Sequence, residues 1–477
     1  MSQLYVVVLV VIVVTLLGVA LYRTSQVKTK ADYLVAGRSL PAIVLVLTLL
    51  TSWIGAGSLF AGAENAYKNG YPALWQPAGG WLGLLLIYFI APRARRFAQF
   101  TLPDLLEARY NQTARVLGTC AILFAYVGIT SYQFKGGGNV LHLIFPDAVS
   151  PELGTYIIAA FVILTTALAG MSSVAYMDVA IGSLVTVICL IAAPTLLSKA
   201  GGWAGLHAAL PASHFQVLGD LSLVRALEFL VPTMLLMLGN QVMYQKFFSA
   251  KSEKDARVSV VGWILGTLLL ETLIVSIAVF GSALYKTGEV ARQPYEIIPY
   301  TARHGLPAFL GALLLGAVFA KVVSTASNYL FSPATNLVND VYVRYIARDA
   351  SNKQVLIVSR LAVVLLGCWA LYQAIYAPSI LEKMLWAYTI YSAALTPVIL
   401  AAFYSKRVTA WGAVAAIAAG TVVTLVWDLP GVKSTFPKIL ADRDAIFPAL
   451  FVSVLAMIVV SMFTPAPKAE QLAQFAE

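Results

Sequence analysis

The stretch Gly311–Tyr342 is long and apolar, yet it contains polar side chains whose spacing could bind a cation. Ser324 and Thr325 follow Lys321 by about one helical turn, so an α-helix places the three on part of one face, and Asn328 comes one turn later. A lysine within a membrane helix is energetically costly and is a functional-site hypothesis by default. Hydroxyl oxygens are possible ion ligands, although in membrane helices they commonly bond back to their own backbone. These residues alone leave both interpretations open.

The composition is that of a protein embedded in a lipid bilayer. Hydrophobic residues make up 60% of the 477 residues and charged residues 11%, and the mean hydropathy is +0.82, whereas a soluble protein carries about a quarter charged residues. The net charge of +10 indicates loop topology rather than nucleic-acid binding, because the basic residues fall between apolar runs. Cys120, Cys189 and Cys368 lie in separate apolar runs, which predicts neither a disulfide framework nor a metal cluster, and no organic cofactor is expected.

Apolar runs long enough to cross a bilayer, roughly 20 residues each, predict an all-α integral membrane protein. We expect about 13 transmembrane helices, near residues 4–22, 41–63, 74–92, 115–143, 154–170, 174–198, 224–245, 258–284, 306–332, 356–376, 384–404, 410–427 and 445–463. A short amphipathic segment, Ile297–His304, is predicted in an outer loop. No H-E-x-x-H or G-x-S-x-G motif occurs and only a short tail follows the last span, so we expect a protein that is not an enzyme.

Basic residues gather in the loops after spans one, three, seven, nine and eleven, and the other loops carry fewer. By the positive-inside rule these loops are cytoplasmic, which places the N-terminus outside and the C-terminus inside a plasma membrane, in bacteria the inner membrane. The residues concerned are Arg23, Lys28 and Lys30; Arg93, Arg95, Arg96 and Arg109; Lys246, Lys251, Lys254 and Arg257; Arg344 and Arg348; and Lys406 and Arg407.

Two of the predicted spans contain helix-breaking residues. The second span carries Gly55, Gly57 and Gly62, and the seventh carries Pro232 followed by the run Gly239–Gln241. Glycine costs about 1 kcal/mol and proline about 3 kcal/mol inside a helix, and such segments are tolerated at membrane depth where they line a cavity. Each segment begins a block of five spans. Interrupted helices in matching positions of two halves indicate an inverted-repeat transporter with a midplane binding site, although glycines in one such segment could instead serve close helix packing.

Seven motifs, in their order and spacing, resemble those of the sodium/solute symporter family. They are DYLVAGRSL, TSWIGAGSLFAGAENAYKNGY, FTLPDLLEARY, AGMSSVAYMD, GNQVMYQKFFSAKS, VVSTASNYLFSPATNLVNDVY and TPVILAAFYSKRVTAWGAVAAIAAG. The resemblance implies a LeuT-type core of two inverted five-helix repeats, with one helix before it and two after. We therefore expect an extra helix with its loop (1–40), a first repeat (41–198), an outer loop (199–223), a second repeat (224–404), two C-terminal helices (405–464) and a cytoplasmic tail (465–477).

The resemblance also implies sodium as the coupling ion. Carried over residue by residue, the sodium ligands are the backbone carbonyls of Thr51, Ile54 and Lys321 and the hydroxyls of Ser324 and Thr325. Asp178 matches a family aspartate on the inner side of this site, although it could instead pair with a loop arginine.

Lys321 departs from the family pattern, which has alanine or serine at this position. Its ammonium group could replace the ion, extend toward the cytoplasm, pair with Glu271 or bind a substrate carboxylate. Because buried lysines change their pKa readily, proton coupling through Lys321 is physically reasonable.

The solute cavity should lie beside the two breaks. Leu236 and Thr389 stand where sugar-transporting relatives have a stacking tyrosine and a glutamine, which argues against a sugar. Trp53 matches a tryptophan of choline transporters, but Asn240 replaces another residue of that aromatic cage. Lys135, in a run that resembles the pantothenate permeases, favours an anionic or zwitterionic solute unless it extends to the outer surface. The candidate solute-binding residues are Ser52, Trp53, Gly57, Tyr126, Gln133, Asn240, Gln241, Trp386, Thr389 and Tyr391.

The sequence thus predicts sodium-coupled uptake of a small carboxylate-bearing or zwitterionic solute by alternating access. Lys321, Asp178, Glu271 and Lys135 are the candidate coupling or gating residues. One alternative is a proton-coupled or ion-independent transporter in which Lys321 replaces sodium. Others, from different classes, are a channel or uniporter and a non-transporting receptor.

Overall fold

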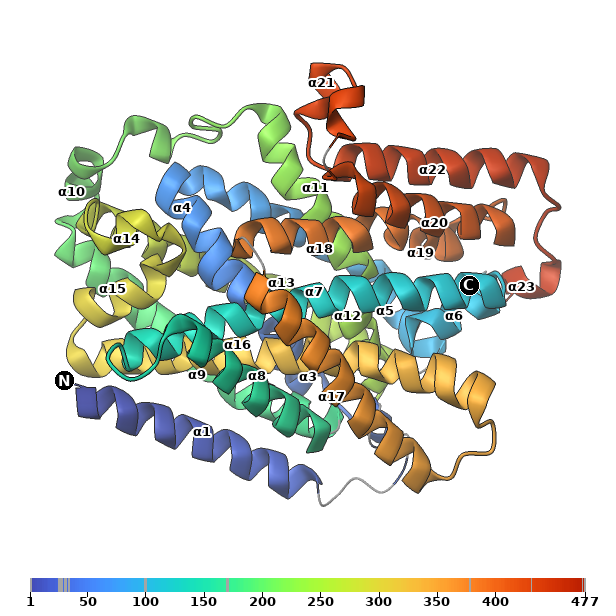
Figure 1. Ribbon diagram of the computed structural model, residues 1–477, viewed down its shortest axis with the longest axis horizontal. Coiled ribbons are helices and arrows are strands. Elements are labelled where there is room, and N and C mark those ends of the chain that lie inside the picture. Colours follow the sequence, from blue (N-terminus) through green and yellow to red (C-terminus); the bar gives the residue numbers. More distant parts are fainter. Residues whose placement is uncertain are drawn as a thin grey trace.

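The computed structural model describes residues 2–24, 35–97, 101–168, 171–376, 379–429 and 431–473, together with the single residues 29, 32 and 475. Every named element in these ranges is a helix, and one isolated β-bridge pairs Leu40 with Ala250. The long helices lie side by side, with the start of α1 (Ser2–Thr24) at one end of the bundle and α23 (Ala469–Ala473) at the other (Figure 1). Two predicted cytoplasmic residues, Lys28 and Lys30, and parts of the DYLVAGRSL and AGMSSVAYMD motifs lie outside the described residues.

The predicted spans coincide with helices to within a few residues at each end. The unbroken long helices are α5 (Trp75–Phe97), α7 (Gln112–Ile144), α8 (Pro151–Leu168), α9 (Met171–Lys199), α13 (Glu253–Leu284), α16 (Ala308–Asn336, continued by the π-helix η6, Leu337–Ile346), α17 (Asn352–Tyr376), α20 (Ala410–Trp427) and α22 (Ile446–Phe463). Short helices lie between them: η1 (Ala36–Arg38), η3 (Tyr71–Leu74), α6 (Leu102–Arg109), α10 (Gly202–Ala209), η4 (Ala212–Phe215), α14 (Glu289–Arg292), η5 (Pro294–Glu296), α15 (Ile297–Gly305), η7 (Lys433–Thr435) and α21 (Lys438–Ala441). Helix α15 is the amphipathic segment expected from the sequence.

Fewer than the expected 13 helices are both long enough and apolar enough to cross a membrane in the described part of the chain. Among the described residues, 11 helices are long and apolar enough to cross a membrane, and the bent pair Ala42–Trp53 and Gly57–Asn69 makes a twelfth. The described apolar part of α1, Gln3–Val19, is shorter than a full span. The count of 13 is therefore not confirmed, although each predicted run is helical over most of its described residues.

Both predicted helix breaks are present. Helix α3 (Ala42–Trp53) ends where Ile54 becomes extended, and the chain resumes as η2 (Gly57–Gly62) and α4 (Ala63–Asn69) at an angle of 55°. A Cβ atom on Gly55 would lie 2.7 Å from the Thr325 side chain, so this turn has room only for glycine.

The second break separates α11 (Leu223–Gly239) from α12 (Gln241–Ser249). The extended residue is Asn240, whose side chain accepts a hydrogen bond of 3.0 Å from the backbone N–H of Val242 and so caps α12. A third break, not predicted, lies at Leu395 between α18 (Ile380–Ala394) and α19 (Thr396–Tyr404). Pro397 lies in the first turn of the new helix, where its missing N–H costs little.

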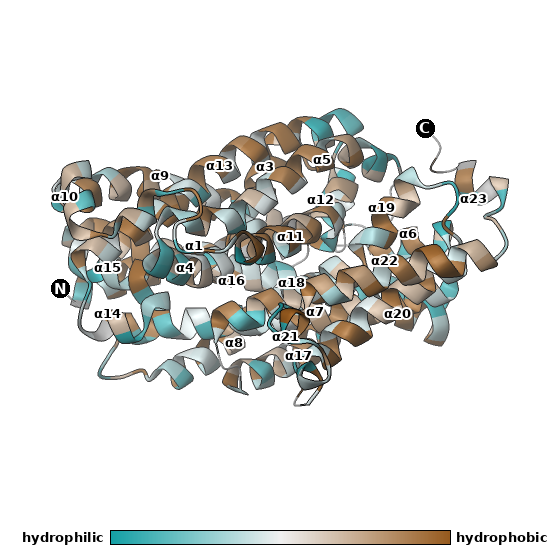
Figure 2. Ribbon diagram, turned by 90° about the horizontal axis from the view of Figure 1, so that it is seen from above, coloured by the Kyte–Doolittle hydropathy of each residue, from teal (hydrophilic) through white to brown (hydrophobic). Residues whose placement is uncertain are grey.

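Helix α16 forms the centre of the bundle and packs against α7, α8, α9 and α17. Almost every residue from Gly311 to Asn336 is buried, including Lys321. Apolar side chains also face outward, among them Phe89 on α5, Leu265 on α13 and Phe451 on α22, and the long helices consist largely of hydrophobic residues (Figure 2). A surface of this kind is suited to contact with lipid hydrocarbon rather than water.

Candidate functional site

Three of the five groups expected to bind sodium converge where α3 breaks beside α16. The hydroxyl of Thr325 lies 3.3 Å from the carbonyl oxygen of Thr51 and 3.1 Å from that of Ile54. The break frees these two carbonyls from their helical partners, and Thr325 presents its oxygen to both. The result is a buried set of three oxygens. Oxygen ligands of this kind replace the hydration shell of a monovalent cation.

The neighbouring hydroxyl of Ser324 is engaged by Asp178 on α9, to which it donates a short hydrogen bond. The fully buried carboxylate of Asp178 also accepts from Thr48 at 2.5 Å and from the amide of Asn328 at 3.3 Å. Thr51 is tied to the same residue, because its hydroxyl donates to the backbone carbonyl of Asp178 at 3.1 Å. Asp178 is thus bonded to both sides of the candidate sodium site rather than to a loop arginine.

Lys321 is fully buried and does not extend to the cytoplasm. Its ammonium group donates to the backbone carbonyl of Leu50 at 3.4 Å, one residue before Thr51. The Glu271 carboxylate instead accepts hydrogen bonds from two tryptophans, Trp53 at 3.0 Å and Trp81 at 3.1 Å. Lys321 therefore brings its side-chain nitrogen to the edge of the candidate sodium site.

Lys246 is the residue that the sequence interpretation misplaced. The pattern of basic residues predicts it in a cytoplasmic loop, but it lies within α12 with no exposed surface. Its ammonium group forms an ion pair of 3.1 Å with Asp178 and donates to the hydroxyls of Thr48 and Ser52, each at 2.5 Å. Helix α12 extends the seventh span by several residues beyond its predicted end at residue 245, and this extension places Lys246 inside the protein.

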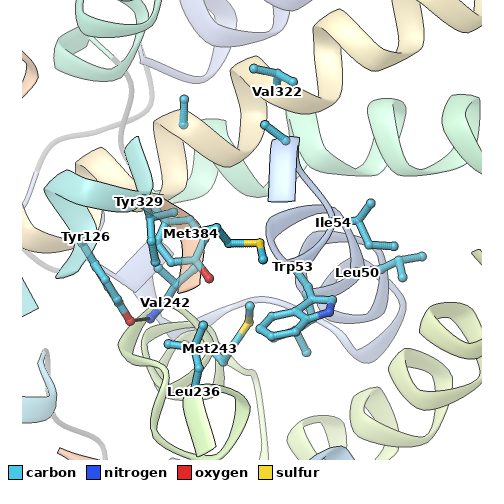
Figure 3. Close-up of a cluster of buried hydrophobic side chains, with 14 of the residues drawn as sticks. Leu50, Trp53, Ile54, Tyr126, Leu236, Val242, Met243, Val322, Tyr329 and Met384 are labelled. Atoms are coloured by element: carbon cyan, nitrogen blue, oxygen red, sulfur yellow. Dashed lines mark hydrogen bonds between the residues drawn. The ribbon is translucent and has the colours of Figure 1, made fainter. Parts of the chain in front are cut away.

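The candidate solute residues nearest the two breaks surround a cluster of aromatic and methionine side chains. Trp53, Tyr126, Met243, Tyr329 and Met384 meet between the end of α3 and the start of α12 (Figure 3). Asn240 crosses this cluster: it accepts from the Tyr126 hydroxyl at 2.8 Å and donates to the Tyr329 hydroxyl at 2.7 Å. The two broken helices thus share one buried aromatic environment.

Three further candidates belong to the same region. Tyr391 stacks on Tyr126 with ring centroids 5.2 Å apart. Gln133 accepts from the backbone N–H of Ala56 at 2.8 Å, which satisfies a donor exposed by the break in α3. Gly57 leaves room for Met384, whose sulfur would lie 3.0 Å from an added Cβ atom.

The remaining solute candidates make other contacts. Ser52 faces Lys246, and Gln241 accepts from the backbone of Leu102 at 3.1 Å and from the side chain of Asn336 at 3.1 Å. Trp386 and Thr389 line a separate cavity that also contains Arg225, Glu382, Lys383, Asp428 and Asp444. Lys135 lines another cavity with Asn139 and Glu152.

Comparison with known proteins gives a consistent result. Residues 33–420 match the model of the "Sodium:solute symporter family". An osmoregulated proline transporter of Bacillus subtilis is 25% identical over 471 residues, covering 95% of this chain and 94% of the relative, and a sodium/proline symporter of Staphylococcus aureus is 26% identical over 465 residues, covering 92% and 88%.

Among solved structures, a substrate-bound, outward-open sodium-coupled sialic acid symporter superposes with a TM-score of 0.82 at 17% identity, covering 98% of both chains. Mhp1, a nucleobase-cation-symport-1 family transporter, superposes with a TM-score of 0.61 at 13% identity, covering 94% and 99%. These likenesses establish the fold, and the family model spans most of the sequence. The chain therefore belongs to the sodium:solute symporter family.

Proposed function

We propose that this protein is a secondary transporter that takes up a small zwitterionic solute, such as proline, together with sodium. The observation that carries the sodium part is the convergence of the Thr325 hydroxyl with the carbonyls of Thr51 and Ile54 at the break in α3. Such a break is where repeat transporters bind their coupling ion, because unwound carbonyls have no helical partner. Sodium is cargo here, released on the far side when the bundle changes conformation.

The solute part is supported by the environment between the breaks and by the relatives. The rings of Trp53, Tyr126 and Tyr329, with Met243 and Met384, provide an apolar contact surface for a compact hydrocarbon ring. The Asn240 amide, which bridges Tyr126 and Tyr329 within this cluster, is a polar group that can orient one end of a ligand. Two relatives of nearly equal length carry names that specify proline.

The test is uptake of labelled proline into proteoliposomes that contain the purified protein. An inward sodium gradient should drive accumulation above the external concentration, and an equal potassium gradient should not. Accumulation separates a symporter from a channel or uniporter, which cannot concentrate a solute, and from a receptor, which exchanges none. Thr325→Ala should raise the sodium concentration needed for half-maximal uptake, and Thr325→Ser should leave it near the wild-type value because the ligand oxygen remains.

A second candidate rests on the position of Lys321, whose ammonium lies 3.4 Å from the Leu50 carbonyl beside the same oxygens. If this charge takes the place of the ion, transport is driven by protons or by the solute gradient alone. Uptake by wild type would then be the same in sodium and potassium, and Lys321→Ala would acquire sodium dependence. Sodium-dependent uptake by wild type that persists in Lys321→Ala excludes this candidate.

The proposal includes an orientation, with the N-terminus outside and the C-terminus in the cytoplasm. The positive-inside pattern supports it. A reporter enzyme that is active only in the cytoplasm, fused after residue 477, should be active.

A further inference from the structure

The surroundings of Lys246 form a cation cage that is complete without any external ion. Four oxygens lie within 3.1 Å of its ammonium nitrogen: the carbonyl and hydroxyl of Thr48, the hydroxyl of Ser52 and one carboxylate oxygen of Asp178. An ammonium group has only three hydrogens to donate, so the cage offers more acceptors than the lysine needs. A carboxylate, two hydroxyls and a carbonyl are also the ligand types that bind hard metal cations in proteins.

The cage takes its residues from three helices, whereas an ion pair alone needs only two. Thr48 and Ser52 belong to α3, Asp178 to α9, and Lys246 comes from α12, which follows the second break. The lysine therefore joins the two broken helices, which are expected to change their relative positions during transport. Neither Lys246 nor Asp178 has any exposed side-chain surface, so the pair is not screened by solvent.

The cage is also coupled to the candidate sodium site. The second carboxylate oxygen of Asp178 accepts from Ser324, the residue next to Thr325. Thr48 and Ser52 lie on the same helix end as Thr51, and the Thr51 hydroxyl donates to the backbone of Asp178 at 3.1 Å. A positive charge in the cage thus sits beside the place where the sodium ion is proposed to bind.

We propose that Thr48, Ser52 and Asp178 form a second monovalent-cation site whose occupant is the chain's own Lys246 ammonium group. The transporter then carries one of its cations as a fixed side chain. A consequence is that removal of the side chain exposes a site that a small external cation will fill.

A cavity of about 10 Å³, lined in part by Thr166, Asp178, Ser324 and Ser327, lies against the Asp178 residue of the cage. The hydroxyls of Thr166 and Ser327 are buried there without a hydrogen-bond partner in the described part of the chain. Thr48, Ser52 and Lys246 do not line this cavity, so the space for an external cation in the cage comes from removal of the Lys246 side chain.

The experiment measures thermal unfolding of the purified full-length protein in sodium chloride, methylammonium chloride or N-methylglucamine chloride at equal ionic strength. Lys246→Ala, which opens the cage, should have its lowest melting temperature in N-methylglucamine, a cation too large to enter. Sodium or methylammonium should raise that melting temperature by at least about twice the rise seen for wild type, because a ligand that binds only the folded state stabilises it. Lys246→Met, which removes the charge but keeps most of the volume, should show no such extra rise.

Lys321→Ala is the matched control, since Lys321 is equally buried but its ammonium donates to a backbone carbonyl rather than to a carboxylate. It should gain no stabilisation by methylammonium. The double variant Lys246→Ala with Asp178→Asn should lose the cation response, because the carboxylate is the charged ligand of the cage.

Two results overturn the proposal: an equal response of Lys246→Ala and wild type to all three salts, or a Lys246→Ala protein that does not fold even when made and purified in sodium or methylammonium. The outcome is separate from that of the proposed function. If wild type shows no sodium-driven uptake, sodium symport fails, yet a methylammonium response gained by Lys246→Ala still establishes the cage.

Discussion

Replacement of Glu271 by glutamine tests whether a buried carboxylate holds the first helix break in place. Glu271 lies on α13 and is 4% exposed. One of its oxygens accepts from the Trp53 indole at 3.0 Å and from Ser58 at 3.4 Å, and the other accepts from the Trp81 indole at 3.1 Å. These donors come from both sides of the break and from α5. An indole N–H can only donate, so both oxygens must be acceptors.

A glutamine side chain offers one acceptor oxygen and one donor nitrogen in place of two acceptors. In Glu271→Gln one of the two indole groups, Trp53 or Trp81, therefore meets an N–H instead of an oxygen. Leaving one buried donor unsatisfied costs about 1–3 kcal/mol, and the bond that remains is weaker without the charge by about 1 kcal/mol. We expect the variant to lose about 2–4 kcal/mol of unfolding free energy.

The assay is equilibrium unfolding of the purified protein by titration with a denaturing detergent, with Trp81→Phe as the matched background. Removal of the Trp81 donor lets the amide oxygen of the introduced glutamine turn toward Trp53, so Glu271→Gln should cost about 1–3 kcal/mol less in Trp81→Phe than in wild type. Strictly additive effects of the two substitutions would refute the reasoning. A Glu271→Gln protein as stable as wild type would also refute it. That result would mean that Glu271 carries a proton, because a glutamine amide mimics a protonated carboxyl group.

The other predictions concern binding, stability and pH. Thr325→Ala should raise the sodium concentration for half-maximal uptake about tenfold, which corresponds to about 1.4 kcal/mol of lost binding, and an unchanged value would remove Thr325 from the ion site. Asn240→Ala should weaken proline binding without altering sodium dependence, because its amide joins two rings of the aromatic cluster; isothermal titration checks this, and equal affinity contradicts it. Arg115→Met should cost about 3–5 kcal/mol of unfolding free energy, since its buried guanidinium pairs with Asp104 at 2.6 Å and with two further carboxylates. Burial acts to raise the pKa of Glu107, but bonds from Arg115 and Arg344 outweigh it and leave that pKa below its ordinary value of 4.5. Its contribution to stability is therefore complete above pH 4.5 and is lost as the pH falls through the lower folded value; thermal unfolding between neutral pH and pH 3 should show this loss in wild type and less of it in Arg344→Met.

Some outcomes were predictable because they follow from local rules. The apolar runs had to become buried or lipid-facing helices, since backbone groups have no other way to be satisfied in a bilayer. Gly55 and Asn240 also indicate their breaks through local properties. A glycine tolerates close contact with a neighbouring helix, and an asparagine caps the start of a helix. The break at Leu395 was missed because its main signal, Pro397, is equally compatible with a kink in a continuous helix.

The site was only partly predictable. Thr51, Ile54 and Thr325 were assigned together through the resemblance to the family, and the Thr325 hydroxyl does lie within 3.3 Å of both carbonyl oxygens. Trp386 and Thr389, predicted for the same solute site as Trp53, line a cavity that Trp53 does not line. Sequence order carries no information about which side of a helix meets which neighbour when all its faces are apolar.

Length, hydropathy and helix-breaking residues were enough to predict a helical membrane protein with two interrupted helices, because these properties act locally. Which charged residues meet in the interior could be seen only in the folded protein. Lys246 reads as one more basic residue at a span end, and its role appears only when α12 places it against Thr48 and Asp178, which lie 198 and 68 positions away in the sequence. The physical reason is that a buried ion pair depends on distance in space, and its cost or benefit is set by partners that no local pattern identifies.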